Sequence, residues 1–193
     1  MSPTAIPTNT GGAIPSAVVA SGIGASYTSI AVDSLGFKHI SYHVNSGKDL
    51  FYATDKTGAW TVTLIDSDSN GYTSIAIDSN DNIHISYYKN ANGGELTYTT
   101  CSSSCSSALS WTSTVVDNGQ NFFDHQITID ANNALHISYY DGSNYDLKYA
   151  KCSSSCSSTS SWTTLLIDSD GQVGSGNSFC LLYTSDAADD HHR

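Results

Sequence analysis

The sequence predicts an all-β fold made of β-propeller blades, and three observations support this prediction. One unit is written three times, as YTSIAVDSLGFKHISYH, YTSIAIDSNDNIHISYY and HQITIDANNALHISYY. Each copy contains short stretches in which apolar and polar residues alternate, as they do in half-buried strands. The copies differ in length only in the polar turns between these stretches, where surface loops tolerate insertions. Four short strands in a period of about 50 residues are typical of one propeller blade.

Four antiparallel strands are expected in each unit. The first strand ends at a repeated Asp, and a tight turn leads into a second strand that carries a repeated His. The third strand contains Leu-x-Tyr, and the fourth begins at a repeated Trp. The expected first strands are 29–33, 74–78 and 126–130, and the expected second strands are 38–43, 83–88 and 135–140. The third strands contain Leu50 and Tyr52, Leu96 and Tyr98, and Leu147 and Tyr149, and the fourth strands begin at Trp60, Trp111 and Trp162.

These units divide the chain into segments. Residues 1–12 are expected to form a flexible N-terminus, and residues 13–26 the outer strand of a preceding blade. The three four-stranded antiparallel blades are 27–71, 72–124 and 125–179. Three blades plus one strand make an incomplete propeller, because closed propellers have about 4 to 8 blades. The chain is therefore expected to be a fragment, and its open blade edges predict self-association.

The C-terminal segment 180–193 differs from the rest of the chain in composition. Its first part, CLLYTSDAADD, resembles the translation of a sequencing adapter, so we predict that 180–193 is not native to the protein. The segment holds the only arginine, Arg193, and the odd fifth cysteine, Cys180. Without it, 6 Lys and 15 acidic residues give a formal net charge of 6 − 15 = −9.

Charge and hydropathy exclude two classes of partner. The whole chain has a formal net charge of −11, which argues against nucleic-acid binding because phosphate recognition needs clustered Lys and Arg. No apolar run approaches the roughly 20 residues of a membrane span. The N-terminus also lacks the charged and apolar regions of a signal peptide. We therefore expect neither a nucleic-acid partner nor a membrane span.

The repeat unit resembles a blade of the bacterial repeat propellers in the sialidase-like, Asp-box (BNR-like) superfamily, over residues 13–178. TDKTGAW at 54–60 approximates the Asp-box pattern Ser-x-Asp-x-Gly-x-x-Trp, with its Gly one position late, and cysteine loops replace it in the next two units. Sialidases of this superfamily use an arginine cluster, a Tyr/Glu pair and an acid. Before the tail this chain has no Arg, and its only Glu is Glu95. The resemblance thus implies the fold, and a complete sialidase site is not expected within this chain.

The sequence CSSSCSS occurs twice, in the turn before the Trp of the second and third units. The spacing allows disulfides Cys101–Cys105 and Cys152–Cys156, since a five-residue turn can bring two Cα atoms within bonding range. Free thiols and an all-cysteine zinc site between blades are the alternatives, although no His lies in either loop. Paired Cys in a Ser-rich β protein fits an oxidising compartment, so an extracellular or cell-surface location is expected.

The repeated polar residues are expected to be structural. A residue that recurs in every unit, as His39, His84 and His136 do, is interpreted as a packed, hydrogen-bonded imidazole rather than a catalytic group. Asp33, Asp78 and Asp130 are interpreted as turn formers.

One turn also resembles the start of a calcium loop. DSDSNG supplies Asp66, Asp68 and Asn70, but Ile77 stands where an EF-hand has its Glu. A smaller calcium site and a solvated turn remain the two interpretations, and no other cofactor is expected.

Residues that break the repeat are better candidates for ligand binding than the repeat itself. Phe122, Phe123, Asp124 and His125 break it between the second and third units, and Tyr145 breaks it in a loop expected on the same face. The alternative is that both Phe pack between blades. We predict a non-catalytic, secreted or surface-displayed propeller fragment that binds a glycan or a protein. A fragment of a sialidase-like glycoside hydrolase whose active site lies in other blades, and a purely structural repeat array, are the alternatives.

Overall fold

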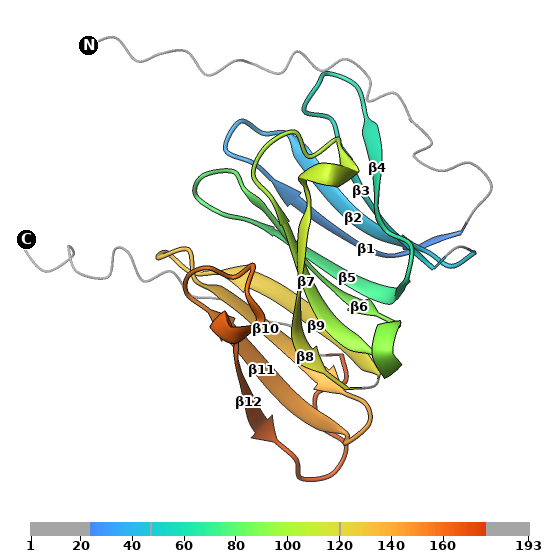
Figure 1. The fold of residues 1–193 in the computed structure, drawn as a ribbon, viewed down its shortest axis with the longest axis vertical. Coiled ribbons are helices and arrows are strands. Elements are labelled where there is room, and N and C mark those ends of the chain that lie inside the picture. The colour runs from blue at the N-terminus through green and yellow to red at the C-terminus, as the bar shows by residue number, and fades with distance from the viewer. Residues whose placement is uncertain (1–23, 47, 120, 177–193) are drawn as a thin grey trace, which may run out of the picture.

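The structure is a computed structural model that describes residues 24–46, 48–119 and 121–176 (Figure 1). The first sheet contains β1 (Ala25–Val32), β2 (Lys38–Val44), β3 (Asp49–Thr54) and β4 (Thr61–Asp66). The second contains β5 (Ser69–Ile77), β6 (Ile83–Lys89), β7 (Glu95–Cys101) and β8 (Thr112–Asn118). The third contains β9 (Phe122–Ile129), β10 (Leu135–Asp141), β11 (Asp146–Cys152) and β12 (Thr163–Asp168). Three short 3-10 helices lie in loops: η1 (Ala91–Gly93), η2 (Ala108–Ser110) and η3 (Thr159–Ser161).

Each sheet has four antiparallel strands paired in chain order, which confirms the predicted four-stranded units. The first strands of the three sheets lie side by side, with β5 between β1 and β9. From these inner strands the sheets fan outward, so that β4 and β12 lie at the outer edges of the two end sheets (Figure 1). In the described part of the chain, no helix is long and apolar enough to cross a membrane.

The middle sheet is covered on both faces by its neighbours. Along β6, Ile83, Ile85 and Tyr87 pack in the cluster shared with the first sheet. Tyr88, on the opposite face, packs in the cluster shared with the third sheet. Side chains alternate between the faces of a strand, so a strand between two sheets must carry large buried residues at consecutive positions. This explains why the repeat reads HISYY rather than a strict apolar and polar alternation.

The repeated aspartates cap the turn between the first and second strands, as predicted. Asp33 accepts hydrogen bonds from the backbone N–H groups of Leu35 and Phe37 at 3.0 and 2.9 Å. Asp78 and Asp130 make the equivalent pairs of hydrogen bonds in the other two sheets. Each turn is thus fixed by its own Asp, a local mechanism that sequence alone can reveal.

The inner strands begin earlier than the sequence pattern indicated. β5 begins at Ser69 and β9 at Phe122, ahead of the unit boundaries placed at 72 and 125. A bulge interrupts the pairing of each inner strand with its neighbour, and pairing resumes beyond the bulge. Most of the expected strand 13–26, the segment 1–12 and the tail 180–193 lie outside the described residues, although β1 begins at Ala25.

Candidate functional site

An open cleft of about 330 Å³ lies where the inner strands begin. Each sheet contributes the same repeat positions to it, so the cleft crosses all three sheets. We call this surface the axial cleft. It is lined by Tyr27, Thr28 and Ser29 of β1, by Tyr72, Thr73 and Ser74 of β5, by Asp124, His125 and Gln126 of β9, and by Gly176.

Three aromatic rings form a row at the axial cleft. The ring centroids of Tyr27 and Tyr72 are 4.4 Å apart, and those of Tyr72 and Phe123 are 5.4 Å apart. Tyr27 is 45% exposed, while Tyr72 and Phe123 are half-buried. Tilted aromatic pairs at such distances attract each other beyond the area that they bury. The row is therefore a preformed apolar platform whose outer ring faces solvent.

The backbone at two of these positions is unusual. Tyr27 has a φ of 51° and Asp124 a φ of 46°, in the left-handed region that L-residues other than Gly rarely occupy. Such a conformation costs about 1 kcal/mol. Both residues lie at the bulges of β1 and β9, where the pairing register shifts. Because a bulge redirects the side chain of its extra residue, this conformation takes Tyr27 and Asp124 out of the regular strand alternation at the cleft.

Asp124 takes the place that Tyr27 and Tyr72 have in the other two units. Its Oδ2 accepts a hydrogen bond from the backbone N–H of Gly176 at 2.8 Å and one from the Ser175 hydroxyl at 3.3 Å. The carboxylate thus holds the segment that follows the third sheet against the cleft. It also places one negative charge beside the aromatic row.

His125 joins the second and third sheets below the cleft surface. Its Nε2 lies 3.1 Å from the carbonyl oxygen of Tyr72, and its Nδ1 lies 3.0 Å from the hydroxyl of Ser86. A carbonyl only accepts, so Nε2 must carry the proton, and Nδ1 accepts from Ser86. Burial lowers the pKa of His125 to about 4. The imidazole is therefore neutral at pH 7 and serves as a fixed link between sheets.

The predicted ligand-binding residues occupy different places. Asp124 and His125 line the axial cleft, and Phe123 lies beside it, with its ring against that of Tyr72. Phe122 is fully buried, with its ring edge-on to Tyr88 and Tyr139, so its side chain belongs to the core. Tyr145 is 47% exposed in the loop between β10 and β11 and is not part of the cleft lining.

Sequence reasoning missed Tyr27 and Tyr72, because repeated residues were set aside as structural. A signal for them did exist. The third unit replaces this Tyr with Asp124, whereas a repeat position that serves packing alone would be expected to keep its apolar character.

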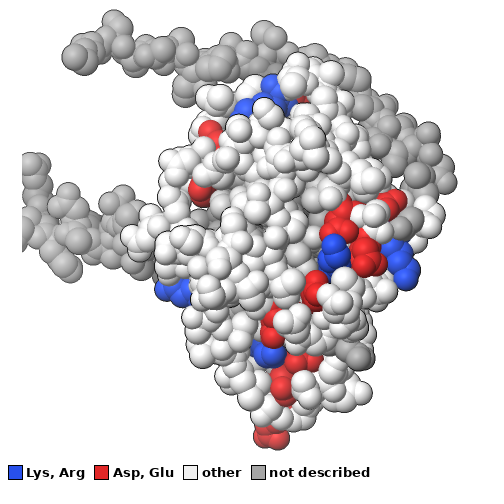
Figure 2. Space-filling view, in the orientation of Figure 1, with Lys and Arg blue, Asp and Glu red and all other residues white. Residues whose placement is uncertain are grey.

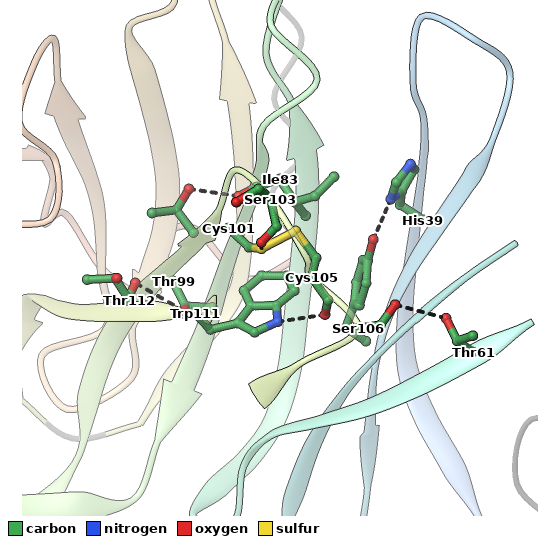
Figure 3. The surroundings of a disulfide bond; sticks show 12 residues. His39, Thr61, Ile83, Thr99, Cys101, Ser103, Cys105, Ser106, Trp111 and Thr112 are labelled. Carbon is green, nitrogen blue, oxygen red and sulfur yellow. Dashed lines mark hydrogen bonds between the residues drawn. A yellow bond between two sulfur atoms is a disulfide. The ribbon is translucent and has the colours of Figure 1, made fainter. Parts of the chain in front are cut away.

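The first cysteine loop lies against the first sheet, where Ser106 is hydrogen-bonded to Thr61 (Figure 3). The second lies against the second sheet, where the Thr114 hydroxyl donates to the carbonyl of Ser157, and neither loop lines the cleft. The sulfur atoms of Cys101 and Cys105 are 2.08 Å apart and those of Cys152 and Cys156 are 2.04 Å apart, which are disulfide distances. The Trp111 indole N–H donates to the carbonyl of Cys105 at 3.0 Å, and its ring meets Tyr52 of the first sheet edge-on. Each clip thus holds a Trp against the Leu-x-Tyr strand of the preceding sheet.

An Asp–His–Tyr set recurs in each sheet, as expected for structural histidines, and it is buried in the first sheet and part-buried in the third. His39 Nδ1 lies 2.6 Å from the Tyr52 hydroxyl, and its Nε2 lies 3.3 Å from Asp33 Oδ2. The equivalent sets are His84 with Tyr98 and Asp78, and His136 with Tyr149 and Asp130. Burial lowers the pKa of His39 and of His84. Burial alone would raise the pKa of Asp33, but hydrogen bonds from Phe37, His39 and Lys56 outweigh it and lower that pKa.

The predicted calcium ligands lie at the turn between the first and second sheets. Asp66 Oδ2 accepts hydrogen bonds from Lys89 Nζ at 2.7 Å and from the Tyr87 hydroxyl at 2.8 Å. Asp66 Oδ1 accepts from the backbone N–H of Asp68, while Asn70 lies within β5. Within residues 24–46, 48–119 and 121–176, no group of three or more His, Cys, Asp or Glu is placed to hold a metal ion. The Asp66 carboxylate is instead compensated by a lysine from the next sheet.

Charged side chains on the face shown in Figure 2 lie mostly next to one another, and most of that face is uncharged. Lys148 pairs with Asp117 between the third and second sheets, as Lys89 pairs with Asp66 between the second and first. These lysines are engaged in ion pairs between sheets, and their charge is compensated there.

The comparisons with known proteins bear on the fold. No protein-family model and no curated protein matches the sequence. Among solved structures, the fold is similar to a fucose lectin from Kordia zhangzhouensis in complex with methyl-fucoside, with a TM-score of 0.47, 19% identity, and coverage of 71% of this chain and 96% of that one. It is also similar to a bifunctional GH43-CE protein of Bacteroides eggerthii, with a TM-score of 0.52, 13% identity, and coverage of 79% of this chain and 20% of that one. The second likeness shows a β-propeller-like fold.

The lining of the axial cleft is chemically suited to binding. A glycosidase needs two carboxyl groups, about 5 to 10 Å apart, on either side of the scissile bond. The described lining offers one carboxylate, Asp124, together with a neutral imidazole that is already hydrogen-bonded on both nitrogens. The lining places apolar ring surface next to hydroxyl groups and one charge. Such a combination can orient a polar ligand.

Proposed function

We propose that this chain is a non-catalytic propeller module that binds a glycan in the axial cleft. The observation that carries the proposal is the row of rings formed by Tyr27, Tyr72 and Phe123, which lies beside the carboxylate of Asp124. A sugar ring has an apolar face of C–H groups and an edge of hydroxyls. The C–H face stacks on an aromatic ring, and the hydroxyl groups donate hydrogen bonds to a carboxylate.

The architecture of the cleft supports recognition of an extended ligand. Each sheet contributes a side chain at the same repeat position, so a ligand along the cleft would meet two tyrosine rings and then a carboxylate. The Thr and Ser residues of β1 and β5 supply hydroxyl groups next to the rings. Because the rings are held by their neighbours, little side-chain entropy is lost when a ligand binds. An oligosaccharide fits this surface better than a compact ligand that needs an enclosed pocket.

The proposal is tested by screening the purified chain on a glycan array and measuring the affinity of a hit by calorimetry. Tyr27→Ala should weaken binding at least tenfold, because it removes the most exposed ring of the row. Asp124→Asn should weaken it as well, through loss of the charged acceptor. Leu109→Ala is the matched control, since Leu109 is 97% exposed in η2 and lies outside the cleft. Glycan binding that neither cleft variant changes would refute the proposed site.

We further propose that the module is secreted or displayed at a cell surface. The two cysteine pairs at disulfide distance support an oxidising compartment. A protein ligand is the second candidate for the same cleft, and it would appear as binding to a folded partner without any hit on the array. A module in which the cleft variants alter no binding of either kind would act as a structural repeat array.

A further inference from the structure

The two end sheets of the described chain carry exposed apolar side chains, one set at each end of the fan. On the first sheet, Ile30 and Val32 of β1 are 61% and 57% exposed. On the third sheet, Leu165 and Ile167 of β12 are 49% and 56% exposed. β1 and β12 belong to the two end sheets, on opposite sides of the middle sheet (Figure 1). Exposed apolar groups that gather on one face mark an interaction surface.

The same repeat positions are buried wherever a neighbouring sheet covers them. Ile75 and Ile127, which correspond to Ile30, are only 6% and 3% exposed. Val116, which corresponds to Ile167, is 5% exposed. The repeat therefore places apolar residues at the positions that become buried when two sheets pack together. On the end faces of the described chain, Ile30, Val32 and Ile167 are exposed, whereas Tyr42 of the first sheet is already only 4% exposed.

The two end faces are the two different halves of the junction between sheets. Between the first and second sheets, Leu50, Tyr52 and Ile65 pack against Ile75, Ile85 and Tyr87. Between the second and third sheets, Leu96, Tyr98 and Val116 pack against Ile127, Ile137 and Tyr139. The third sheet carries the first half at its outer face, as Leu147, Tyr149 and Ile167, and the first sheet carries the second half, as Ile30, Ile40 and Tyr42. Each face thus complements the other face and not itself.

A polar contact of the junction is repeated in the same way. The Tyr87 hydroxyl donates to Asp66 at 2.8 Å, and the Tyr139 hydroxyl donates to Asp117 at 2.7 Å. Asp168 on the third sheet and Tyr42 on the first sheet hold the corresponding positions, and of the two only Asp168 is exposed, since Tyr42 is 4% exposed within one chain. Asp168 Oδ1 accepts from the backbone N–H of Asp170, just as Asp66 Oδ1 accepts from that of Asp68. The acceptor is therefore oriented as it is in the junction between the first and second sheets.

We propose that the third sheet of one copy packs against the first sheet of a second copy, as the sheets pack within the chain, and that two copies close a ring of six sheets. Such a head-to-tail contact uses two different surfaces and closes when the rotation per sheet allows it. Six sheets fall within the range of about 4 to 8 blades that closed propellers have. In the ring, Tyr27 of the second copy would follow Asp124 in the row along the cleft. The proposal stands whether or not the cleft binds a glycan.

Light scattering during size exclusion tests the proposal on the full chain. The wild type should have twice the chain mass of 20.5 kDa. Ile30→Asp combined with Val32→Asp breaks one face, and Ile167→Asp breaks the other. Each variant alone should be monomeric, since its intact face then finds no counterpart. An equimolar mixture of the two variants should form dimers again, through the one junction that remains intact.

The substituted residues are more than half exposed within a single chain, so each variant should fold, and circular dichroism checks this. Leu109→Asp is the control, since it adds a charge at an exposed leucine outside both faces and should leave the dimer intact. A wild-type chain that is monomeric at high concentration would overturn the proposal, whether residues outside the described part or nothing at all cover the faces. Variants that still dimerise alone, or a mixture that stays monomeric, would overturn it as well.

Discussion

Several buried polar side chains of this chain connect strands within a sheet or connect one sheet to the next. Each repeated His is held by a Tyr of its own sheet and an Asp of its own turn. Tyr87 and Tyr139 reach across to an Asp of the preceding sheet. Removing one partner of a buried polar pair is costly, because the other group is then left in the interior without it. The repeated sets therefore contribute to the geometry of each sheet and of its Asp turn.

His125 gives the protein a defined acid sensitivity. Its pKa is about 4 in the folded state, against an ordinary value of 6.5 for an unburied histidine, so the folded state binds fewer protons between these values. The stability that the neutral His125 contributes to the folded state is fully present above about pH 6.5. It decreases as the pH falls towards 4, and it does not decrease further below pH 4. The loss from this residue is on the order of 3 kcal/mol. Urea unfolding at several pH values should show it.

His125→Gln is the variant that isolates this effect. Gln keeps an N–H donor for the Tyr72 carbonyl but does not titrate. The free energy of unfolding of the variant should fall less steeply than that of the wild type between pH 6.5 and 4. An identical slope for both proteins would show that other groups carry the acid sensitivity.

At the scale of elements, the cysteine loop is a local clip with a measurable effect. The bridged cysteines are 4 positions apart in sequence, so closing the loop restricts the unfolded chain only modestly. The stabilisation expected from chain entropy for so short a loop is about 2 kcal/mol. Replacing Cys101 and Cys105 by Ala should lower the free energy of unfolding by that amount, measured in urea without reductant.

The second clip provides the comparison for the first. Replacing Cys152 and Cys156 by Ala should have a similar effect, and the two losses should add because the loops lie in different sheets. A pair whose replacement changes nothing would have contained free thiols in solution, which is the alternative that the sequence left open.

The turn at Asp66 allows a second prediction at the scale of elements, on the effect of calcium. Its carboxylate pairs with Lys89 and Tyr87, so the turn needs no cation for charge balance. The melting temperature should therefore be the same in EDTA and in millimolar calcium. A rise with calcium would establish the proposed ion site, since a ligand that binds only the folded state must stabilise it. Asp66→Asn would then abolish the rise.

At the scale of the whole molecule, some parts of the structure could be predicted from the sequence and others could not. The three sheets, the Asp turns and the cysteine pairs follow from local patterns that repeat, and the structure agrees with them. The bulges at Tyr27 and Asp124 were not readable, because pairing beyond a bulge depends on the partner strand. The cleft was predicted only in part, since Asp124 and His125 were candidate residues and Tyr27 and Tyr72 were not. Its residues come from three strands that meet only once the sheets pack together, and Phe122 and Phe123 differ in burial although they are adjacent.

The proposed ring makes a last prediction for the molecule as a whole. If two copies share their end faces, folding is coupled to association, and the melting temperature must rise with protein concentration. Scans over a wide range of concentration should show an upward shift for the wild type and none for the variant with Asp at positions 30 and 32. Because the shift depends on mass action, it separates association from a stability effect within one chain. A wild-type melting temperature that is independent of concentration would mean that the faces of Ile30 and Ile167 do not meet between two copies.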